Sequence, residues 1–432
     1  MSERADFESR LESRLRSRAS HATPPFDAAA IARRAVAPGN RPTGIALRWA
    51  SLPGGLRWSL VALALAGSVI GTLAIGGPLL EQSRRPAAVT NGWIAFTVET
   101  IDRNGYSNIY IVRPGELERR IISPDRYGIR EICPQFSPDG TRIAYLSNQS
   151  DPPAIGEDRS RFGIRIVAVG ADGVAAGAPQ VLVNGVDGSA CPEWAADGLS
   201  VVYMQHRTLH VHRLDGGSTT IDAGPSTGEP GAFAVSPTGA EIAYVGPSSV
   251  WIVSFDGEAR RRVYEAPGDI QLDAPQWSPD GERIVVEATR VVQVTDGATI
   301  EDLPARIIQI DGTSEPIELA GVESIAWSPD GQRLAAFRST TVNGLDWGEL
   351  VTMTRHGTDV RVLADAYCCF RGLTWSPDGM QVAYVDDDYG ATPGLLAVAA
   401  SGDADPVVLL SKPYWLEYTN SEDLSWQAVF PR

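Results

Sequence analysis

One pattern of apolar and polar positions recurs along most of the chain. In each copy an aromatic residue precedes a short polar turn, and a run of β-branched, small and aromatic residues follows it. The clearest copies place Ser-Pro-Asp-Gly directly after Phe136, Trp277, Trp327 and Trp375, and weaker copies begin at Trp194 and around Ser236-Pro237-Thr238-Gly239. Pro fixes φ, Asp tolerates unusual backbone angles and Gly supplies a positive φ, so each copy predicts a β-hairpin. A repeat of roughly 40 to 50 residues indicates a solenoid, a propeller or an array.

Further strand-like segments follow each hairpin, for example residues 108–112 and 250–253. Each copy therefore predicts a four-stranded antiparallel sheet, which must stack on its neighbours because it cannot bury both faces alone. Residues 92–96 look like the second strand of a copy, and residues 424–427 look like the first strand of one. Pairing them in one blade would close a ring and remove exposed edges. We predict an all-β, seven-bladed β-propeller closed by its N- and C-terminal strands, with six blades as the alternative.

The pattern Pro-x-Trp-Ser-Pro-Asp-Gly-x-x-Ile-Ala-Tyr resembles the WD-like repeat of TolB-type β-propellers. It also resembles the propellers of prolyl-oligopeptidase-like enzymes. The resemblance covers residues 92–432. It implies the fold and leaves the function open, because propellers carry many unrelated activities.

Residues 58–80 contain no charged side chain over 23 positions. About 20 apolar residues suffice to cross a bilayer, and the run is too long and too far from Met1 for a signal peptide. The first 57 residues contain ten arginines and five carboxylates, which favours an N-terminus in the cytoplasm. We therefore predict a bacterial single-pass membrane protein with a cytoplasmic tail (1–57), a transmembrane helix (58–80), a linker (81–91) and an extracytoplasmic propeller (92–432).

The tail contains a short amphipathic helix on which Phe7, Leu11 and Leu15 share one face. Such a helix cannot bury a core by itself, so its apolar stripe predicts a cytoplasmic partner. The layout resembles bacterial transmembrane anti-sigma factors, which implies a sigma factor as that partner, although the tail has no cysteine and no zinc signature. The alternative is a basic helix lying on an anionic membrane surface.

The formal net charge is −16, and the excess of carboxylates lies after residue 57. An acidic propeller argues against nucleic acid, because phosphate binding requires clustered Arg and Lys. Three further patterns have ordinary structural explanations: Gly224-Pro225-Ser226-Thr227-Gly228 lacks the context of a nucleophilic serine, His206, His210 and His212 lack a carboxylate ligand, and Asp386-Asp387-Asp388 lacks the spacing of a calcium loop. We predict no catalytic residue, metal or cofactor.

The four cysteines are Cys133, Cys191, Cys368 and Cys369. Cys133 and Cys191 occupy equivalent places in neighbouring copies, and thiols outside the membrane can oxidise. Bridges 133–191 and 368–369 are one arrangement, free buried thiols are another, and sequence alone does not choose among the possible pairings. Tyr367, Phe370 and Arg371 lie beside the second pair and form a candidate partner face.

These observations predict a protein that is not an enzyme and whose propeller binds a protein, peptide or glycan and signals to a cytoplasmic partner. Two alternatives remain: an extracytoplasmic propeller enzyme, such as a metal-dependent hydrolase or a lactonase, and a structural scaffold of the cell envelope.

Overall fold

The computed structural model describes residues 89–429 except for sixteen short gaps. These are residues 101–106, 115, 117–118, 121–128, 150–161, 171, 187, 189, 207, 223–231, 295–296, 343–344, 367–369, 387–393, 412–415 and 418–423. All described residues belong to the second of two units into which the chain divides, Arg85–Arg432. Within the described part, no helix is long and apolar enough to cross a membrane. The predicted span at 58–80 and the predicted tail helix with Phe7, Leu11 and Leu15 lie outside it.

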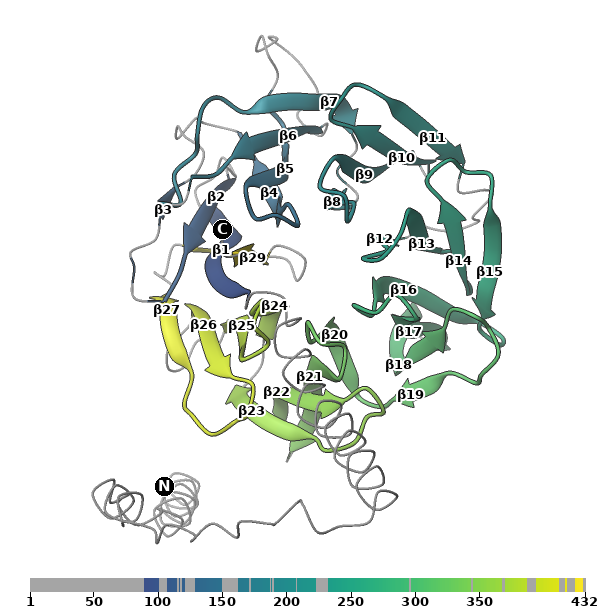
Figure 1. The fold of residues 1–432 in the computed structure, drawn as a ribbon. Coiled ribbons are helices and arrows are strands. Elements are labelled where there is room, and N and C mark those ends of the chain that lie inside the picture. The colour runs from purple at the N-terminus through teal and green to yellow at the C-terminus, as the bar shows by residue number, and fades with distance from the viewer. Residues whose placement is uncertain are drawn as a thin grey trace, which may run out of the picture. The chain divides into compact units, whose positions relative to one another are not determined.

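The described residues form seven antiparallel sheets arranged as blades around a central axis (Figure 1). Six blades have four strands in chain order from the centre outwards, and the blade that contains both ends of the propeller has a fifth, two-residue strand. The seven-bladed propeller predicted from the repeat is confirmed, and the six-bladed alternative is wrong.

Blade 1 contains β29 (Ser425–Val429), β1 (Thr90–Thr100), β2 (Ser107–Val112) and β3 (Arg119–Arg120), and β28 (Leu416–Glu417) pairs with the end of β1. Blade 2 contains β4 (Glu131–Phe136), β5 (Arg142–Ser147), β6 (Phe162–Ala168) and β7 (Gln180–Val186). Blade 3 contains β8 (Glu193–Trp194), β9 (Ser200–Gln205), β10 (Thr208–Arg213) and β11 (Ser218–Asp222). Blade 4 contains β12 (Phe233–Val235), β13 (Glu241–Val245), β14 (Ser249–Ser254) and β15 (Arg260–Glu265).

Blade 5 contains β16 (Ile270–Trp277), β17 (Arg283–Val294), β18 (Gly297–Gln309) and β19 (Ile317–Leu319). Blade 6 contains β20 (Val322–Trp327), β21 (Arg333–Val342), β22 (Leu345–Thr354) and β23 (Arg361–Ala366). Blade 7 contains β24 (Phe370–Trp375), β25 (Gln381–Asp386), β26 (Gly394–Ala399) and β27 (Val407–Ser411).

The ring closes in blade 1, where the C-terminal strand β29 is the innermost strand and pairs with β1. Ile94 lies opposite Trp426, and Ala95 lies opposite Ser425. The side chain of Gln427 is buried and makes two hydrogen bonds. Its Oε1 accepts from the backbone N–H of Trp93 (3.0 Å), and its Nε2 donates to the backbone carbonyl of Gly140 (2.6 Å). Gln427 therefore joins the closing strand to blade 2 as well as to blade 1.

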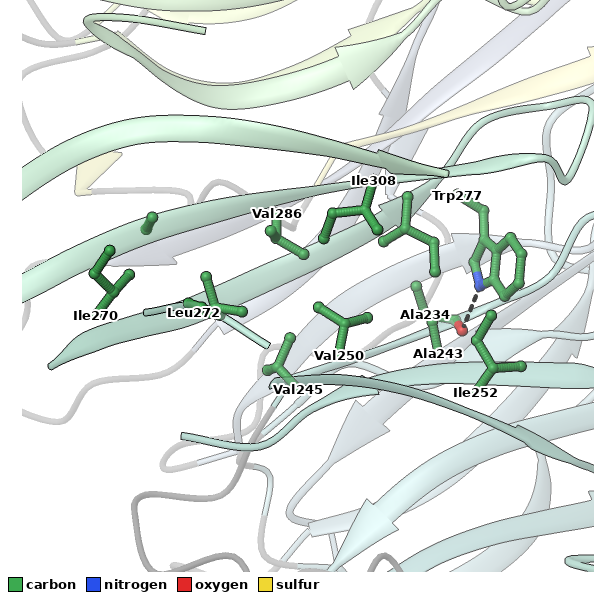
Figure 2. Close-up of a cluster of buried hydrophobic side chains, with 13 residues drawn as sticks. Ala234, Ala243, Val245, Val250, Ile252, Ile270, Leu272, Trp277, Val286 and Ile308 are labelled. Atoms are coloured by element: carbon green, nitrogen blue, oxygen red, sulfur yellow. Dashed lines mark hydrogen bonds between the residues drawn. The ribbon is translucent and has the colours of Figure 1, made fainter. Parts of the chain in front are cut away.

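The hydrophobic core is divided into seven clusters, and each cluster combines side chains of two neighbouring blades. Figure 2 shows the cluster between blades 4 and 5, where Val250 and Ile252 of β14 face Leu272 and Val286. Successive strand residues point to opposite faces. Val285 therefore packs against blade 6, while Val286 packs against blade 4. Burial on both faces explains why these strands have continuous apolar runs instead of a simple alternation.

The Ser-Pro-Asp-Gly turns join the two innermost strands of a blade and share one hydrogen-bond pattern. In blade 5 the Ser278 hydroxyl donates to Asp280 (2.5 Å) and accepts from the Arg283 N–H (2.9 Å), and the Gly281 N–H donates to the Ser278 carbonyl (2.8 Å). The turns at Ser137, Ser328 and Ser376 repeat these contacts. The turn aspartates therefore stabilise the turns.

Candidate functional site

A cavity of about 790 Å³ lies among the innermost strands and receives residues from all seven blades. Its size is within the range of small-molecule sites in proteins, roughly 300 to 1,000 Å³. Blade 1 contributes Leu424, and blades 2 to 7 contribute residues from each innermost strand, including the aromatic residue of each clear repeat. We call it the central cavity. It is concave, lies where all seven blades meet and is the candidate functional site.

Three of the indoles around the central cavity link neighbouring blades by hydrogen bonds. The N–H groups of Trp194, Trp277 and Trp375 each donate to a backbone carbonyl of the preceding blade, at Gln135, Ala234 and Ala326, with a donor–acceptor distance of 3.0 Å in each case. Figure 2 shows the contact between Trp277 and Ala234. These aromatic residues therefore have a structural role as well as a position in the wall of the cavity.

Four innermost strands contain a β-bulge at the same place in the repeat. A residue with positive φ lies three positions before the aromatic residue: Cys133 (59°), Ala274 (47°), Ser324 (49°) and Gly372 (53°). At each of them the pairing with the second strand shifts by one residue. Bulges re-aim nearby side chains and are common beside active sites. Sequence reasoning predicted a positive φ only for the turn glycines and missed these bulges.

The charged side chains among the described lining residues are three carboxylates, Glu193, Asp273 and Glu287. Glu193 accepts a hydrogen bond from the Val235 N–H of the next blade (2.7 Å). Asp273 and Glu287 lie directly opposite each other on β16 and β17, so their side chains leave the sheet on the same face. The structure thus brings two carboxylates together at the seam between blades 5 and 6.

Glu287 has a perturbed pKa and lies in the wall of the central cavity. Burial raises its pKa above the usual range, because desolvation disfavours the charged form. The carboxylates of Glu323, Asp273 and Asp302 raise the pKa further, and a hydrogen bond from the Ser324 N–H to Oε1 (2.7 Å) opposes them. A carboxyl group with a raised pKa in a cavity is a candidate for general acid–base catalysis.

Sequence reasoning missed Glu287, although the repeat contains a signal for it. The equivalent position, three residues after the first apolar residue of the second strand, is Leu146, Met204, Val245, Phe337 or Val385 in the other copies that have a turn. Each of these side chains packs between its own blade and the next. Glu287 is the one carboxyl group at this apolar position, and that departure from the pattern marks it.

The cysteine pair predicted in neighbouring copies is bonded. Cys133 of blade 2 and Cys191 of blade 3 form a disulfide with a Cα–Cα distance of 5.3 Å, and Cys191 also lines the central cavity. Cys368, Cys369 and Tyr367 lie outside the described residues. The disulfide therefore links two blades at the wall of the site.

The candidate partner face is described only in part. Phe370 stacks on Phe337 (ring centroids 5.2 Å apart) and meets Tyr384 edge to face (5.4 Å), so it packs between blades 6 and 7. Arg371 lies in β24, with its backbone opposite Val385. Phe370 is not among the described residues that line the central cavity.

The histidines of blade 3 do not assemble a metal site. His210 stacks on Tyr203 (4.9 Å between centroids) and lies 3.3 Å from the Thr220 hydroxyl, and burial lowers its pKa, with a further contribution from His206. No group of three His, Cys, Asp or Glu side chains able to hold a metal occurs in the described part of the chain. Ser226 of the Gly-x-Ser-x-Gly match, Asp387 and Asp388 fall in the gaps.

Comparison with known proteins adds the following. No family model matches the chain. A protein of Bacillus subtilis named "Uncharacterized peptidase YuxL" is 23% identical over 246 residues, which are 56% of this chain and 29% of that protein. The chain thus spans less than a third of the length of the curated relative it matches.

Among solved structures, the β-propeller domain of the Trilobed protease from Pyrococcus furiosus has a TM-score of 0.53 at 13% identity. The match covers 76% of this chain and 100% of that domain's chain. TolB from Acinetobacter baumannii has a TM-score of 0.44 at 14% identity (78% and 66% covered). A putative 6-phosphogluconolactonase from Bacteroides uniformis has a TM-score of 0.43 at 14% identity (77% and 99% covered). At these identities the likeness concerns the fold alone, and a seven-bladed β-propeller is the fold that the repeat predicted.

These similarities correct one sequence-based prediction. The chain was expected not to be an enzyme, yet the curated relative is named as a peptidase and the similar propeller of Pyrococcus furiosus is a domain of a protease. The expectation relied on the missing nucleophile–base pair of the Gly-x-Ser-x-Gly match and on the incomplete histidine set. It did not consider a carboxyl group on the second strand of a blade, because the other copies that have a turn carry an apolar residue there.

Proposed function

We propose that this protein is a propeller enzyme that binds its substrate in the central cavity and uses Glu287 as a general acid–base. The observation that carries the proposal is Glu287 itself: a carboxyl group with a raised pKa lines the central cavity directly opposite a second carboxylate, Asp273. Burial and like charge move the pKa of a catalytic carboxyl group towards neutral pH, where both of its protonation states are accessible.

The proposed reaction is hydrolysis. In its ionised form Glu287 accepts a proton from a water molecule, the water oxygen attacks an electrophilic carbon of the substrate, and the leaving group departs with a proton returned by the carboxyl group. Asp273 is exposed and lies directly opposite Glu287, so it is suited to orienting the substrate or the water. No metal takes part in this scheme.

The experiment uses the full-length protein in detergent and a panel of chromogenic probes: aryl esters, lactones and peptide arylamides. We expect Glu287→Gln to lower kcat about 10²- to 10⁴-fold, the usual contribution of a general acid–base. Glu315→Gln is the matched control, because Glu315 is exposed and does not line the central cavity. Equal rates for the wild type and Glu287→Gln on every hydrolysed probe would contradict the assignment.

A second function follows from the relative named as a peptidase. In this alternative the central cavity binds a peptide and presents it to peptidase chemistry carried by another polypeptide or domain. The alternative predicts that the purified chain binds peptides but releases no product from any arylamide. Saturable binding that is unchanged in Glu287→Gln favours this alternative over catalysis by Glu287.

We also propose that the enzyme is anchored by residues 58–80 with the propeller outside the cytoplasm. The uncharged run and the basic segment before it support this topology, and so does the Cys133–Cys191 disulfide, because disulfides persist in oxidising compartments. Carbonate extraction of membranes tests the anchor: the wild type should stay in the pellet, and a variant without residues 58–80 should not. Release of the wild type would contradict the anchor.

The cytoplasmic tail adds a prediction about partners. We propose that the apolar stripe of Phe7, Leu11 and Leu15 binds a cytoplasmic protein such as a sigma factor. Crosslinked purification should recover that protein with the full chain and lose it with a triple Phe7→Ser, Leu11→Ser, Leu15→Ser variant. Identical recovery with both forms would leave the membrane surface as the site where the helix binds.

A further inference from the structure

Ser324 has an unusual backbone conformation at the edge of the central cavity. It lies in the bulge of β20 with φ at 49°, a left-handed conformation that non-glycine residues seldom adopt. Such a conformation is strained for a residue with a Cβ, and it persists only where the surroundings enforce it. The bulge separates the pair Glu323–Phe337 from the pair Ala326–Ala335.

The bulge directs the Ser324 N–H towards the neighbouring blade. This N–H donates to Oε1 of Glu287 at 2.7 Å, across the seam between blades 5 and 6. Oε2 of Glu287 accepts no hydrogen bond from the described residues, so this one contact orients the carboxyl group. The equivalent bulge of blade 5 makes a local contact instead, because the Ala274 N–H donates to Oδ1 of the preceding residue, Asp273, at 2.8 Å.

The charged groups around Glu287 make this contact important. Each strand packed against it supplies a carboxylate: Asp273 on β16, Asp302 on β18 and Glu323 on β20. No cation among the described residues acts on Glu287 to offset them. The Ser324 N–H is therefore the one group that favours the ionised form, which is the form that accepts a proton from water.

We propose that Ser324 is a positioning residue: its left-handed backbone holds an N–H against Oε1 of Glu287, fixes the orientation of the carboxyl group and leaves Oε2 to act on the substrate. The inference rests on the proposed function for its catalytic meaning, while the coupling between the two residues is a separate claim. Ser324 acts through Glu287, so its proposed role is positioning and not catalysis.

The test is an NMR titration of the full-length protein in detergent, with ¹³C at the glutamate carboxyl carbon and ¹⁵N at serine. Glu287→Gln assigns the Glu287 signal by its disappearance. We expect the Ser324 amide to shift with pH at the same midpoint as the Glu287 carboxyl carbon, and this shift to vanish in Glu287→Gln. An amide that is insensitive to the titration of Glu287 would overturn the proposal.

Two variants test the backbone itself. Ser324→Gly keeps the N–H and adopts a positive φ without cost, so the Glu287 midpoint should stay where it is in the wild type. Ser324→Val resists a positive φ, so the N–H should turn away and the Glu287 midpoint should move to higher pH. The lower limb of the pH profile of kcat/KM should move with it. Identical midpoints in the wild type and both variants would overturn the proposal.

The two claims fail separately. If the amide coupling is present and Glu287→Gln leaves every rate unchanged, the positioning contact stands and the proposed catalytic role is wrong. If Glu287→Gln abolishes turnover and the coupling is absent, Glu287 is catalytic and another group positions it.

Discussion

At the scale of single residues, the carboxylates of the propeller fall into two kinds. For Asp139 and Asp280, partial burial raises the pKa, but hydrogen bonds from Ser137, Ser278 and nearby backbone groups outweigh it and lower the pKa. Both carboxylates are ionised and are hydrogen-bonded within their own turns. Glu287 has the opposite shift and one free oxygen, because it lies at a seam that other blades fill with apolar side chains. The difference separates structural carboxylates from a candidate catalytic one.

Glu287→Gln should stabilise the protein at neutral pH while it removes activity. The folded-state pKa of Glu287 is raised, so the folded form binds its proton more tightly than the unfolded chain does. The associated stability is present below the unfolded pKa and is lost as pH rises through the folded pKa. Glutamine keeps an acceptor for the Ser324 N–H without a charge. We expect the free energy of unfolding to rise by about 1 kcal/mol at pH 7, the usual scale for replacing a strained functional group.

Urea denaturation of both forms at pH 4 and pH 7 measures this effect. The stability gain of Glu287→Gln should be larger at pH 7 than at pH 4. A gain of the same size at both values, or a loss at pH 7, would show that the carboxyl group is not destabilised by its surroundings.

At the scale of elements, the turn between the two inner strands of a blade also packs against the preceding blade. A Cβ on Gly331 would lie 3.5 Å from Cδ of Pro279, and one on Gly379 would lie 3.7 Å from Cδ of Pro329, both ordinary contacts. Gly140 differs, because its Cβ would lie 2.3 Å from the carbonyl oxygen of Ala428 in the closing strand β29. The turn of blade 2, which contacts the closing strand, is therefore more tightly packed at its glycine than the turns at Gly331 and Gly379.

Gly140→Ala should therefore destabilise the propeller more than Gly331→Ala does. Both glycines have similar positive φ values, 69° and 66°, so alanine meets the same backbone penalty at both, about 1 kcal/mol. Only Gly140 adds a clash with backbone, and we expect its total cost to reach about 3 kcal/mol or more. Thermal unfolding of the two variants measures the difference. Equal losses would mean that β29 moves aside without cost.

Gln427→Ala tests the closing strand from the other side. The substitution leaves the Trp93 N–H and the Gly140 carbonyl without their partner in a buried setting. An unsatisfied buried group costs roughly 1 to 3 kcal/mol, so we expect a loss of about 2 to 4 kcal/mol in denaturant unfolding. Gln332→Ala is the control, because Gln332 is exposed and a loss within about 0.5 kcal/mol is expected there.

At the scale of the whole molecule, stability is distributed around a closed ring. Each of the seven core clusters lies between two blades, so no blade has a core of its own. Besides packing and the hydrogen bonds between blades, the ring is held by the pairing of β29 with β1 and by the disulfide between blades 2 and 3. Because the disulfide lies at the central cavity, it joins the stability of the ring to the shape of the site.

Removing the disulfide should lower the free energy of unfolding by about 4 kcal/mol, the chain-entropy estimate for a loop of 58 residues. Disulfides in proteins typically contribute about 2 to 4 kcal/mol. The double variant Cys133→Ser, Cys191→Ser should unfold at lower temperature than the wild type without reductant. Under reductant the wild type should approach the variant. A reductant effect of equal size in the double variant would assign the effect to another part of the chain.

The sequence by itself determined the blades. The turn requires residues with particular backbone angles and a strand buried on both faces requires an apolar run, so the same residue pattern recurs along the chain. It also predicted ring closure, since residues 92–96 resemble the second strand of a blade and residues 424–427 resemble its missing first strand. The site depended on tertiary structure. Asp273 and Glu287 are 14 positions apart and Ser324 is 37 beyond Glu287, and only strand register and the seam between blades bring them together. The repeat predicts the features that its copies share. The site instead consists of residues that differ from the repeat, and which of these residues meet depends on which blades are neighbours.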